Sequence, residues 1–556
     1  MKINHLLFLV LSAGTSILRG QGLTPSRIVK PSPDSWPTYH GDYSGRHYSA
    51  LSQINRSNVR NLSLAWVTRP RTTIQTAIIG GEGSGQENGA GVGGAASLIV
   101  KATPLVVDGV IYLSTIDNAY AFDALTGKEI WHYFWKTRGG SRFGNRGVGM
   151  YGKWVFFETP DNYVVSLDAA TGKERWHRQI SDVQAGYYSS SAPTIIGNHV
   201  LVGTGGDYQD IPGYVESLNP ETGDVQWRWY SVPRPGEPGS ETWPDVYSME
   251  HGGGSPWLPP TYDPELNLVY ITTGNPQPVM IGDSRKGDDL WTCSIVALNP
   301  DTGKMAWYFQ TSPHDTHDWD ATEVPVLFDA KIDGRPRKLL AQANRNGIFF
   351  LLDRTNGKNI LATAFIPSAN WISGFQKDGR PIPNPAKEPQ VGGVLVSPNE
   401  GGGANWPPPT YDPDTELFYV NTSEEFSLHY RLHTADSKVT GYDGDAEHYV
   451  GGLGAALRAI DPKTGKLRWI HPYPGAEGGP PRPQYLAGLL TTAGHLLFGG
   501  GPSSHLICYD PTDGKILWHS GLADEVSNTA ITYMLDGVQY VLVAGGDSLY
   551  AFSLQK

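Results

Sequence analysis

The chain of 556 residues contains 67 glycines, 42 prolines and 17 tryptophans, while charged residues make up only 18% of it. Its formal net charge of −12 argues against a nucleic-acid ligand, because neutralising phosphates requires a basic surface. The two cysteines, Cys293 and Cys508, fall at different offsets from the repeat described below, so we expect two buried thiols rather than a disulfide. No Cys-x-x-Cys-His sequence that would attach a haem is present.

The first residues have the features of a secretory signal peptide. Lys2 supplies one positive charge, and a short apolar run from Leu6 to Ala13 follows it. This run is too short to span a bilayer, and no other segment reaches membrane-spanning length. We therefore expect a signal peptide over about residues 1–20, a linker over residues 21–35, and a periplasmic or secreted protein that does not span a membrane.

A short sequence word recurs seven times along the chain. An acidic or amide residue is followed four positions later by glycine and eight positions later by tryptophan, with leucine in place of tryptophan once. The words begin at Asp123, Asp168, Asn219, Asn299, Asp353, Asp461 and Asp510. Each lies between two strand-like runs, and therefore predicts a strand, a tight turn closed by glycine, and a second strand.

Repetition of one such unit predicts a β-propeller. The strand-like segments 62–68 and 538–552 have no word of their own, so we expect them to meet in an eighth blade that closes the ring and protects its edges. The predicted fold is all-β, an eight-bladed β-propeller of four-stranded antiparallel blades, and it forms a single domain over residues 36–556.

The intervals between words are uneven, and extra length in a propeller goes into loops on one face, where a site is commonly built. A second repeat lies in two of the long intervals. Trp257, followed by Tyr262-Asp-Pro and Tyr270, is matched at every spacing by Trp406, followed by Tyr411-Asp-Pro and Tyr419.

The segment 312–320 concentrates three aspartates and two histidines in nine residues. Alternate residues of an extended strand share a face, so Asp318 and Asp320 can point into one space. Crowded carboxylates repel one another unless they bind a cation or take up a proton, and their hard oxygens suit Ca²⁺ or a similar ion. A solvated acidic loop is the alternative. His314 and His317 lack zinc-site geometry, so we expect polar loop contacts for them.

Several other loops offer glycine for close backbone approach, an oxygen ligand, a cation or a flat aromatic side chain. They are Thr204–Asp207, Ser255–Trp257, Thr273–Asn275, Asn344–Gly347 and Asn405-Trp406. Each by itself is typical of a turn or a core tryptophan. Together they indicate that loops from several blades converge on one anionic, planar ligand with a metal.

These segments together resemble the quinoprotein dehydrogenases, the pyrroloquinoline quinone (PQQ) family that includes methanol and ethanol dehydrogenases. The resemblance runs from Trp36 to about Phe552 and includes Ala102-Thr-Pro-Leu-Val-Val-Asp-Gly, Gly282-Asp-Ser-Arg-Lys-Gly-Asp-Asp and Leu352-Asp-Arg-Thr-Asn-Gly. It implies an eight-bladed propeller with PQQ in a central funnel beside a bound Ca²⁺ or lanthanide ion.

The resemblance also implies roles for individual residues. Asp207 and Asn275 match metal ligands, and Asp320 matches the extra aspartate of the lanthanide-dependent branch. Asp318 matches the catalytic base and is also expected at the metal. Trp257 matches the tryptophan on one face of PQQ. The complete set of expected cofactor-binding residues is Lys101, Arg146, Ser190, Ser255, Trp257, Arg345 and Asn405, with Lys101 and Arg146 placing positive charge near the PQQ carboxylates.

The chain departs from the family pattern at several places. The adjacent-cysteine disulfide that often covers the other face of PQQ has no counterpart in residues 139–145, and Lys101 replaces a glutamate. Asp207 is one methylene shorter than the usual glutamate, and Tyr485 or Leu486 stands where a further cofactor tryptophan is expected. The fold tolerates these changes, but they bear directly on cofactor affinity and turnover.

We therefore expect a PQQ-dependent dehydrogenase that oxidises an alcohol or related hydroxyl compound. The metal would act as a Lewis acid on the quinone carbonyl, Asp318 would remove the hydroxyl proton, and electrons would leave to a separate cytochrome c. A lanthanide is the favoured ion and Ca²⁺ the alternative. Two other functions stay open: a non-catalytic propeller scaffold or binding protein, favoured by Lys101 and the missing cysteines, and a sugar or polyol quinoprotein dehydrogenase. A candidate lid at residues 427–449 bears on the substrate.

Overall fold

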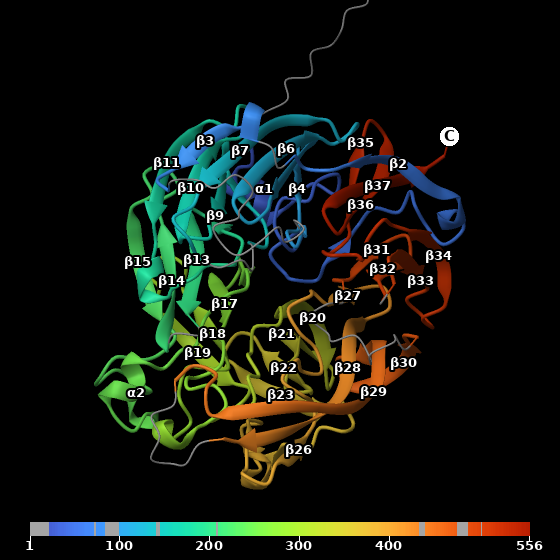
Figure 1. Ribbon diagram of the computed structural model, residues 1–556. Helices are drawn as coiled ribbons and strands as arrows, with labels where there is room; N and C mark the ends of the chain where they lie inside the picture. The colour runs from blue at the N-terminus through green and yellow to red at the C-terminus, as the bar shows by residue number, and fades with distance from the viewer. Residues whose placement is uncertain are drawn as a thin grey trace, which may run out of the picture.

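The computed structural model describes residues 22–71, 74–83, 99–140, 145–206, 210–432, 440–474, 487–501 and 503–555. Eight sheets follow one another around a central axis, with the chain passing from blade to blade in sequence order (Figure 1). Within each blade the four strands form an antiparallel meander. This arrangement confirms the predicted all-β propeller of four-stranded blades.

The first four blades contain the strands from β4 to β19. Blade 1 comprises β4 (Leu105–Val107), β5 (Val110–Ser114), β6 (Asn118–Asp123) and β7 (Glu129–Lys136), with β3 (Ile78–Gly81) parallel to β7. Blade 2 comprises β8 (Gly149–Tyr151), β9 (Trp154–Glu158), β10 (Tyr163–Asp168) and β11 (Glu174–Gln179). Blade 3 comprises β12 (Thr194–Ile196), β13 (His199–Gly206), β14 (Ile211–Leu218) and β15 (Val225–Tyr230). Blade 4 comprises β16 (Thr261–Asp263), β17 (Leu268–Thr272), β18 (Ser294–Leu298) and β19 (Met305–Gln310).

The remaining blades complete the circle. Blade 5 comprises β20 (Val326–Ile332), β21 (Arg335–Ala343), β22 (Ile348–Asp353) and β23 (Lys358–Ala364). Blade 6 comprises β27 (Thr410–Asp412), β28 (Leu417–Arg431), β29 (Asp445–Asp461) and β30 (Lys466–Pro472), with β26 (Val394–Val396) on the far part of β28. Blade 7 comprises β31 (Leu490–Thr492), β32 (Leu496–Gly500), β33 (His505–Tyr509) and β34 (Ile516–Gly521), with β1 (Tyr48–Ser49) parallel to β31. Blade 8 comprises β35 (Ile531–Leu535), β36 (Val538–Gly545), β37 (Ser548–Leu554) and β2 (Leu62–Thr68).

Three short elements lie outside the blades: the helices α1 (Pro25–Val29) and α2 (Val246–Glu250), and the hairpin of β24 (Ile372–Phe375) and β25 (Pro381–Pro383). None of the helices in the described ranges is long and apolar enough to cross a membrane.

The two ends of the chain meet in blade 8, as the repeat count predicts. Strand β2, from the N-terminal part, pairs antiparallel with the last strand β37, in a register that sets Leu62 opposite Leu554. In Figure 1 the blue β2 and the red β35 to β37 lie in one sheet. Such a closure leaves no open sheet edge between the first and last blades, so the ring is held by backbone hydrogen bonds.

The recurring word is explained by how each blade contacts the next. The tryptophan of one word packs on the glycine of the following word: a Cβ atom added to Gly172 would lie 2.7 Å from the Trp131 ring. The Nε1 atom of Trp131 also donates to the carbonyl oxygen of Ala169 at 2.9 Å. Leu361, the one substitute for tryptophan, packs on Gly465 in the same way. Glycine is required here for two reasons: its φ is positive, and the neighbouring side chain leaves no room for a Cβ atom.

Cys293 and Cys508 are both buried and unpaired, which confirms the expectation of two free thiols. They lie in different blades, and burial raises the pKa of each thiol well above its usual value. Both therefore behave as small apolar core residues rather than as nucleophiles or redox groups.

Candidate functional site

The meander topology brings the candidate site residues to one face of the ring. In a four-stranded up-and-down blade, the loop between the second and third strands and the connection to the next blade lie at the same end. Lys101, Arg146, Ser190, Ser255, Trp257, Asp318, Asp320 and Asn405 all lie on blade-to-blade connections, and Asn275 and Arg345 lie between second and third strands. Asp207 follows β13 but lies outside the described residues. Residues more than 300 positions apart in sequence, such as Lys101 and Asn405, thus share one face.

Asp320 accepts hydrogen bonds from three directions. Its Oδ2 atom accepts from Nε1 of Trp257 at 3.0 Å and from Nη1 of Arg345 at 3.0 Å. Its Oδ1 atom accepts from the backbone N–H of Asn275 at 2.7 Å. The carboxylate is almost fully buried, and burial raises its pKa even though the Arg345 charge opposes that shift. Three of the predicted site residues are therefore joined directly through Asp320.

Arg345 bridges the two aspartates of the acidic segment. Its Nη2 atom lies 2.9 Å from Oδ2 of Asp318, and its Nε atom donates to the carbonyl oxygen of Glu400 at 3.0 Å. Burial by itself lowers the pKa of Arg345, but the charges of Asp318 and Asp320 outweigh it and hold the guanidinium firmly protonated. One cation thus offsets two buried carboxylates, and the cluster keeps a net negative charge.

The third aspartate of the segment has a structural role. Oδ2 of Asp315 accepts from the backbone N–H groups of His317 and Trp319 at 3.3 and 3.0 Å, and burial raises its pKa to about 6. His314 and His317 each contact a backbone carbonyl oxygen, those of Gly287 and Lys387. These contacts agree with the loop role expected for the two histidines.

Arg146 lies between two tryptophan rings. Its guanidinium carbon is 4.4 Å from the centre of the Trp257 ring and 5.1 Å from that of Trp406, distances at which a cation is attracted to an aromatic face. Its Nη1 atom donates to the carbonyl oxygen and to Oγ of Ser190 at 2.7 and 2.9 Å. Burial lowers the pKa of Arg146 to about 10. Lys101 is half-buried close by, and burial together with the Arg146 charge lowers its pKa.

Three polar groups at the site are buried and have no hydrogen-bond partner among the described residues. They are Oγ of Ser255, Oδ1 of Asn275 and Nε of Arg146. An unpartnered buried polar atom is costly, so such groups point to a ligand, an ion or a water at that position. Asn405 differs, because its side chain is engaged within its own loop through Gly401 and Trp406.

The predicted metal ligands are brought together in part. Asn275, Asp318 and Asp320 lie in one hydrogen-bonded cluster. In the described ranges no three carboxylate, histidine or cysteine side chains form a ready metal site, and the fourth predicted ligand, Asp207, lies outside those ranges. The loop that lacks the cysteine pair is described only at residues 139–140 and from Asn145, and Tyr485 and Leu486 also lie outside the described part.

Trp406 is a site residue that sequence reasoning did not assign to the cofactor. It comes directly before β27 as Trp257 comes before β16, so the two rings occupy equivalent positions in blades 6 and 4 and both contact Arg146. The signal was present in the repeat around Tyr262 and Tyr411, which copies the tryptophan with its strand.

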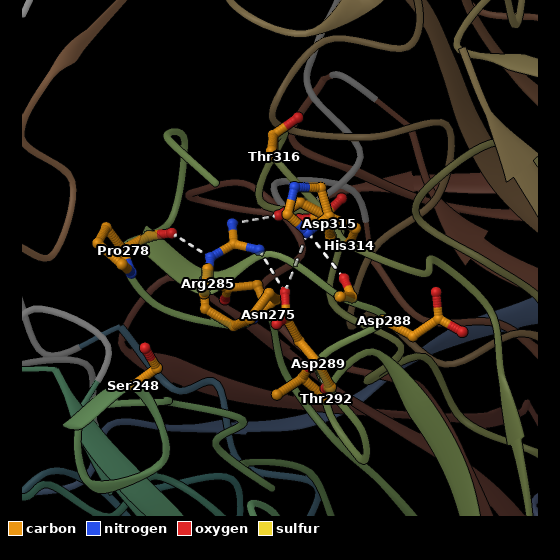
Figure 2. A network of polar contacts seen from close by, with 12 residues as sticks. Ser248, Asn275, Pro278, Arg285, Asp288, Asp289, Thr292, His314, Asp315 and Thr316 are labelled. Atoms are coloured by element: carbon orange, nitrogen blue, oxygen red, sulfur yellow. Dashed lines mark hydrogen bonds and ion pairs between the residues drawn. The ribbon is translucent and has the colours of Figure 1, made fainter. Parts of the chain in front are cut away.

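A second residue that was missed, Arg285, holds the loop beneath the acidic segment (Figure 2). It is fully buried and pairs with Asp289 at 2.7 Å. Its other N–H groups donate to three backbone carbonyls, those of Pro278, Val279 and Asp315, at 2.9, 3.1 and 2.5 Å. All of these partners belong to the loop 276–292 or to the segment 312–320. Arg285 therefore ties the loop that follows Asn275 to the segment that carries Asp318 and Asp320.

Replacing Arg285 with Met is expected to destabilise the protein by about 3–5 kcal/mol, because it leaves the Asp289 charge and three carbonyls without their partner. Chemical denaturation followed by tryptophan fluorescence measures this. Arg380, which pairs with Asp378 near the surface, is the matched control, and its replacement with Met should cost no more than about 1 kcal/mol. Equal losses for the two variants would contradict the role given to Arg285.

Comparisons with known proteins agree with the propeller fold. The family profile described as "Glucose/ethanol/alcohol dehydrogenase, beta-propeller domain" matches residues 36–370. The quinoprotein alcohol dehydrogenase PedH of Pseudomonas putida is 35% identical over 539 residues, covering 90% of this chain and 84% of the relative. The structure of quinohemoprotein alcohol dehydrogenase ADHIIG from Pseudomonas putida HK5 has a TM-score of 0.83 and 29% identity, over 96% of this chain and 83% of that chain.

A europium-containing methanol dehydrogenase is similar over 95% of this chain and 99% of that chain, with a TM-score of 0.79 and 27% identity. A second profile, described as "Outer membrane protein assembly factor BamB", matches residues 453–556. The first profile covers more than half of the chain, and the relatives match nearly all of it at more than 30% identity. The chain therefore belongs to the PQQ-dependent, or quinoprotein, alcohol dehydrogenase family, whose members are oxidoreductases acting on CH–OH groups.

Proposed function

We propose that this protein is a PQQ-dependent dehydrogenase that oxidises an alcohol or related hydroxyl compound in the periplasm. The observation that carries the proposal is the buried cluster of Asp318, Asp320 and Arg345, joined directly to Trp257 and Asn275. A scaffold would gain nothing from two buried carboxylates on one guanidinium, because such groups lose solvation without adding apolar contact.

The side chains of this face fit a planar ligand with three carboxylates. Arg146, Lys101 and Arg345 supply positive charge, while Trp257 and Trp406 supply flat faces of the right size. The unpartnered Oγ of Ser255 and Nε of Arg146 offer further hydrogen bonds. The Arg146 guanidinium covers one face of the Trp257 ring. A ligand stacked on that face would displace the guanidinium and turn it toward a carboxylate of the ligand. When bound, PQQ supplies a quinone carbon that accepts a hydride.

Asp318 has the position and environment of the proton acceptor. Its Oδ2 atom is held by Arg345, and its Oδ1 atom faces the residues 440–443 that lie over the site. Arg345 keeps the carboxylate oriented, in position to take a hydroxyl proton. Burial of the cluster excludes bulk water from the reacting groups and strengthens their mutual electrostatic effects.

The proposed metal is a lanthanide or Ca²⁺, held by Asp207, Asn275, Asp318 and Asp320. The unpartnered Oδ1 atom of Asn275 and the paired aspartates give the hard oxygen donors that these ions prefer. A bound cation would take over part of the role of Arg345 in offsetting the two carboxylates. Its Lewis acidity would favour hydride acceptance by the quinone.

We further propose an external electron acceptor, a separate cytochrome c, because the sequence contains no haem-attachment motif. The apolar run after Lys2 supports export through a signal peptide. The ring of eight blades supports a single propeller domain over residues 36–556. Several relatives, such as the alcohol dehydrogenase of Comamonas testosteroni, are named quinohemoproteins. These names refer to a haem and so support electron transfer as the next step in those proteins.

Reconstitution tests the proposal. The purified protein is incubated with PQQ and either Ca²⁺ or a light lanthanide, and a dye-linked assay is run over a panel of alcohols, polyols and sugars. We expect turnover that requires both PQQ and an ion. Tight PQQ binding without turnover on any substrate would overturn the proposal and leave a binding protein, while turnover confined to sugars or polyols would correct the substrate class.

A further inference from the structure

The hairpin of β28 and β29 extends well beyond its own blade. The two strands stay paired from Phe418 opposite Ile460 to Arg431 opposite Asp445, far longer than any other pair in the ring. Only the first part belongs to blade 6, where β27 and β30 flank it. The outer part carries the chain over the site face, as the orange strands in Figure 1 show.

Residues 440–443, directly before β29, are fixed to the site at three points. The N–H of Gly441 donates to Oδ1 of Asp210 at 2.7 Å, and its carbonyl oxygen accepts from the N–H of Val279 at 2.8 Å. The hydroxyl of Tyr442 donates to Oδ1 of Asp318 at 3.3 Å. An ion pair between Arg431 and Asp283 adds a fourth link further along the hairpin.

These links place Tyr442 in a specific relation to the proposed base. Arg345 holds one carboxylate oxygen of Asp318, Oδ2, and Tyr442 approaches the other, Oδ1. Tyr442 is also close enough to Arg345 to contribute to the rise in its pKa, which places the phenol beside the whole cluster. The 3.3 Å contact is longer than a usual O–H···O hydrogen bond, so it is easily exchanged for a better partner. A substrate hydroxyl that binds Oδ1 would therefore replace the Tyr442 hydroxyl or lie beside it.

We propose that Tyr442 is the substrate-positioning and size-selecting residue of this site, resting on the proposed alcohol oxidation. Its hydroxyl orients the Oδ1 atom of Asp318 and contacts the hydroxyl of the bound alcohol. Its ring forms the wall behind which the alkyl group of the substrate must fit. We expect this wall to favour a short primary alcohol over a longer one, because Tyr442 lies directly beside the oxygen atom to which the substrate hydroxyl would bind.

The loop beneath this wall is held by several polar contacts, which would restrain the wall against a larger substrate. Val279, which binds Gly441, belongs to the segment whose carbonyls receive Arg285. His429 of the hairpin is fully buried, lies near Asp445 and faces the ring of His317 at 5.4 Å. The wall is therefore attached both to the loop after Asn275 and to the segment that carries Asp318.

The test compares Tyr442→Phe and Tyr442→Ala with the wild type, each reconstituted with PQQ and the supporting ion. Tyr442→Phe should raise KM for a short primary alcohol about threefold to tenfold, the value of one hydrogen bond, with kcat changed less than threefold. Tyr442→Ala should shift the kcat/KM ratio of a six-carbon over a two-carbon primary alcohol upward by about tenfold. PQQ affinity, followed by quenching of tryptophan fluorescence, should stay within twofold.

Tyr430→Phe is the matched control, because Tyr430 lies on the same hairpin with its ring against Gly393 and should leave all of these values unchanged. An unaltered alcohol preference in Tyr442→Ala, or a loss of PQQ affinity as large as the rise in KM, would overturn the inference.

A second readout needs no turnover. In the protein without cofactor, amide hydrogen exchange at Val279 and Gly441 should be at least tenfold faster in Tyr442→Ala than in wild type, since both amides are bonded under residues 440–443. Unchanged exchange would refute the placement of Tyr442. If the reconstituted wild type is inactive but exchange is still faster in Tyr442→Ala, the proposed function is wrong while the contact between Tyr442 and Asp318 stands.

Discussion

Replacing Asp318 with Asn is expected to lower kcat of the reconstituted enzyme by about 10²–10⁴-fold, the range that general base catalysis contributes. The amide keeps the size of the side chain and a hydrogen bond toward Arg345, but it cannot accept a proton from the substrate hydroxyl. A steady-state assay with the dye-linked acceptor measures the effect, with PQQ binding followed in parallel.

Asp288→Asn serves as the control for this variant. Asp288 lies in the neighbouring loop and pairs with Arg380 at 3.2 Å, partly exposed to solvent, so its neutralisation should leave kcat within about twofold of wild type. An Asp318→Asn enzyme that binds PQQ and retains more than a tenth of the wild-type kcat would show that another group takes the proton.

Replacing Asp320 with Ala is expected to abolish turnover supported by a lanthanide, by at least about 100-fold, while sparing any activity supported by Ca²⁺. Asp207, Asp318 and Asp320 would bring three negative charges, of which the Arg345 guanidinium offsets one, and a trivalent ion is attracted to them more strongly than a divalent one. Large, oxygen-seeking ions also tolerate the irregular coordination that loops from different blades provide. Turnover with La³⁺ and with Ca²⁺, compared at saturating PQQ, measures the effect.

Asp320 also supports Trp257, Asn275 and Arg345, so loss of the whole side chain removes three hydrogen bonds together with the charge. Asp320→Asn separates these effects, because it retains most of the shape and lacks the charge. Terbium luminescence measures ion binding directly for both variants. If the wild type works equally well with both ions and neither variant changes that, the lanthanide assignment is wrong.

The propeller could be predicted from the sequence because its signal is local. The glycine of each word, such as Gly172, has a positive φ and lies against a tryptophan ring, or against Leu361 in the case of Gly465, so the same few residues encode both the turn and the contact between blades. Counting the words and the two unpaired ends then predicts eight blades, and the pairing of β2 with β37 confirms it. A short-range pattern repeated around a ring determines the whole arrangement, because the sheet of every blade packs against the sheets of its two neighbours.

The candidate site was predicted differently, through ordered matches to a family, and those of the named residues that the structure describes lie on one face of the ring. The resemblance did not reveal which groups contact one another. The bridge of Arg345 between Asp318 and Asp320 joins two segments from adjacent blades. The contact of Arg146 with Trp257 and Trp406 joins three separate connections. Neither has a local sequence signal.

The sequence by itself determined the repeat, the closure of the ring, the free cysteines and the family. Only the tertiary structure decided that Asp315 caps its own loop while Asp318 and Asp320 face Arg345. It also decided that Arg285 holds the loop after Asn275, and that Tyr442, more than 120 positions beyond Asp318, reaches its carboxylate. The physical reason is that turns and blade contacts depend on residues close in sequence, whereas a buried polar cluster depends on partners that only the closed ring brings together.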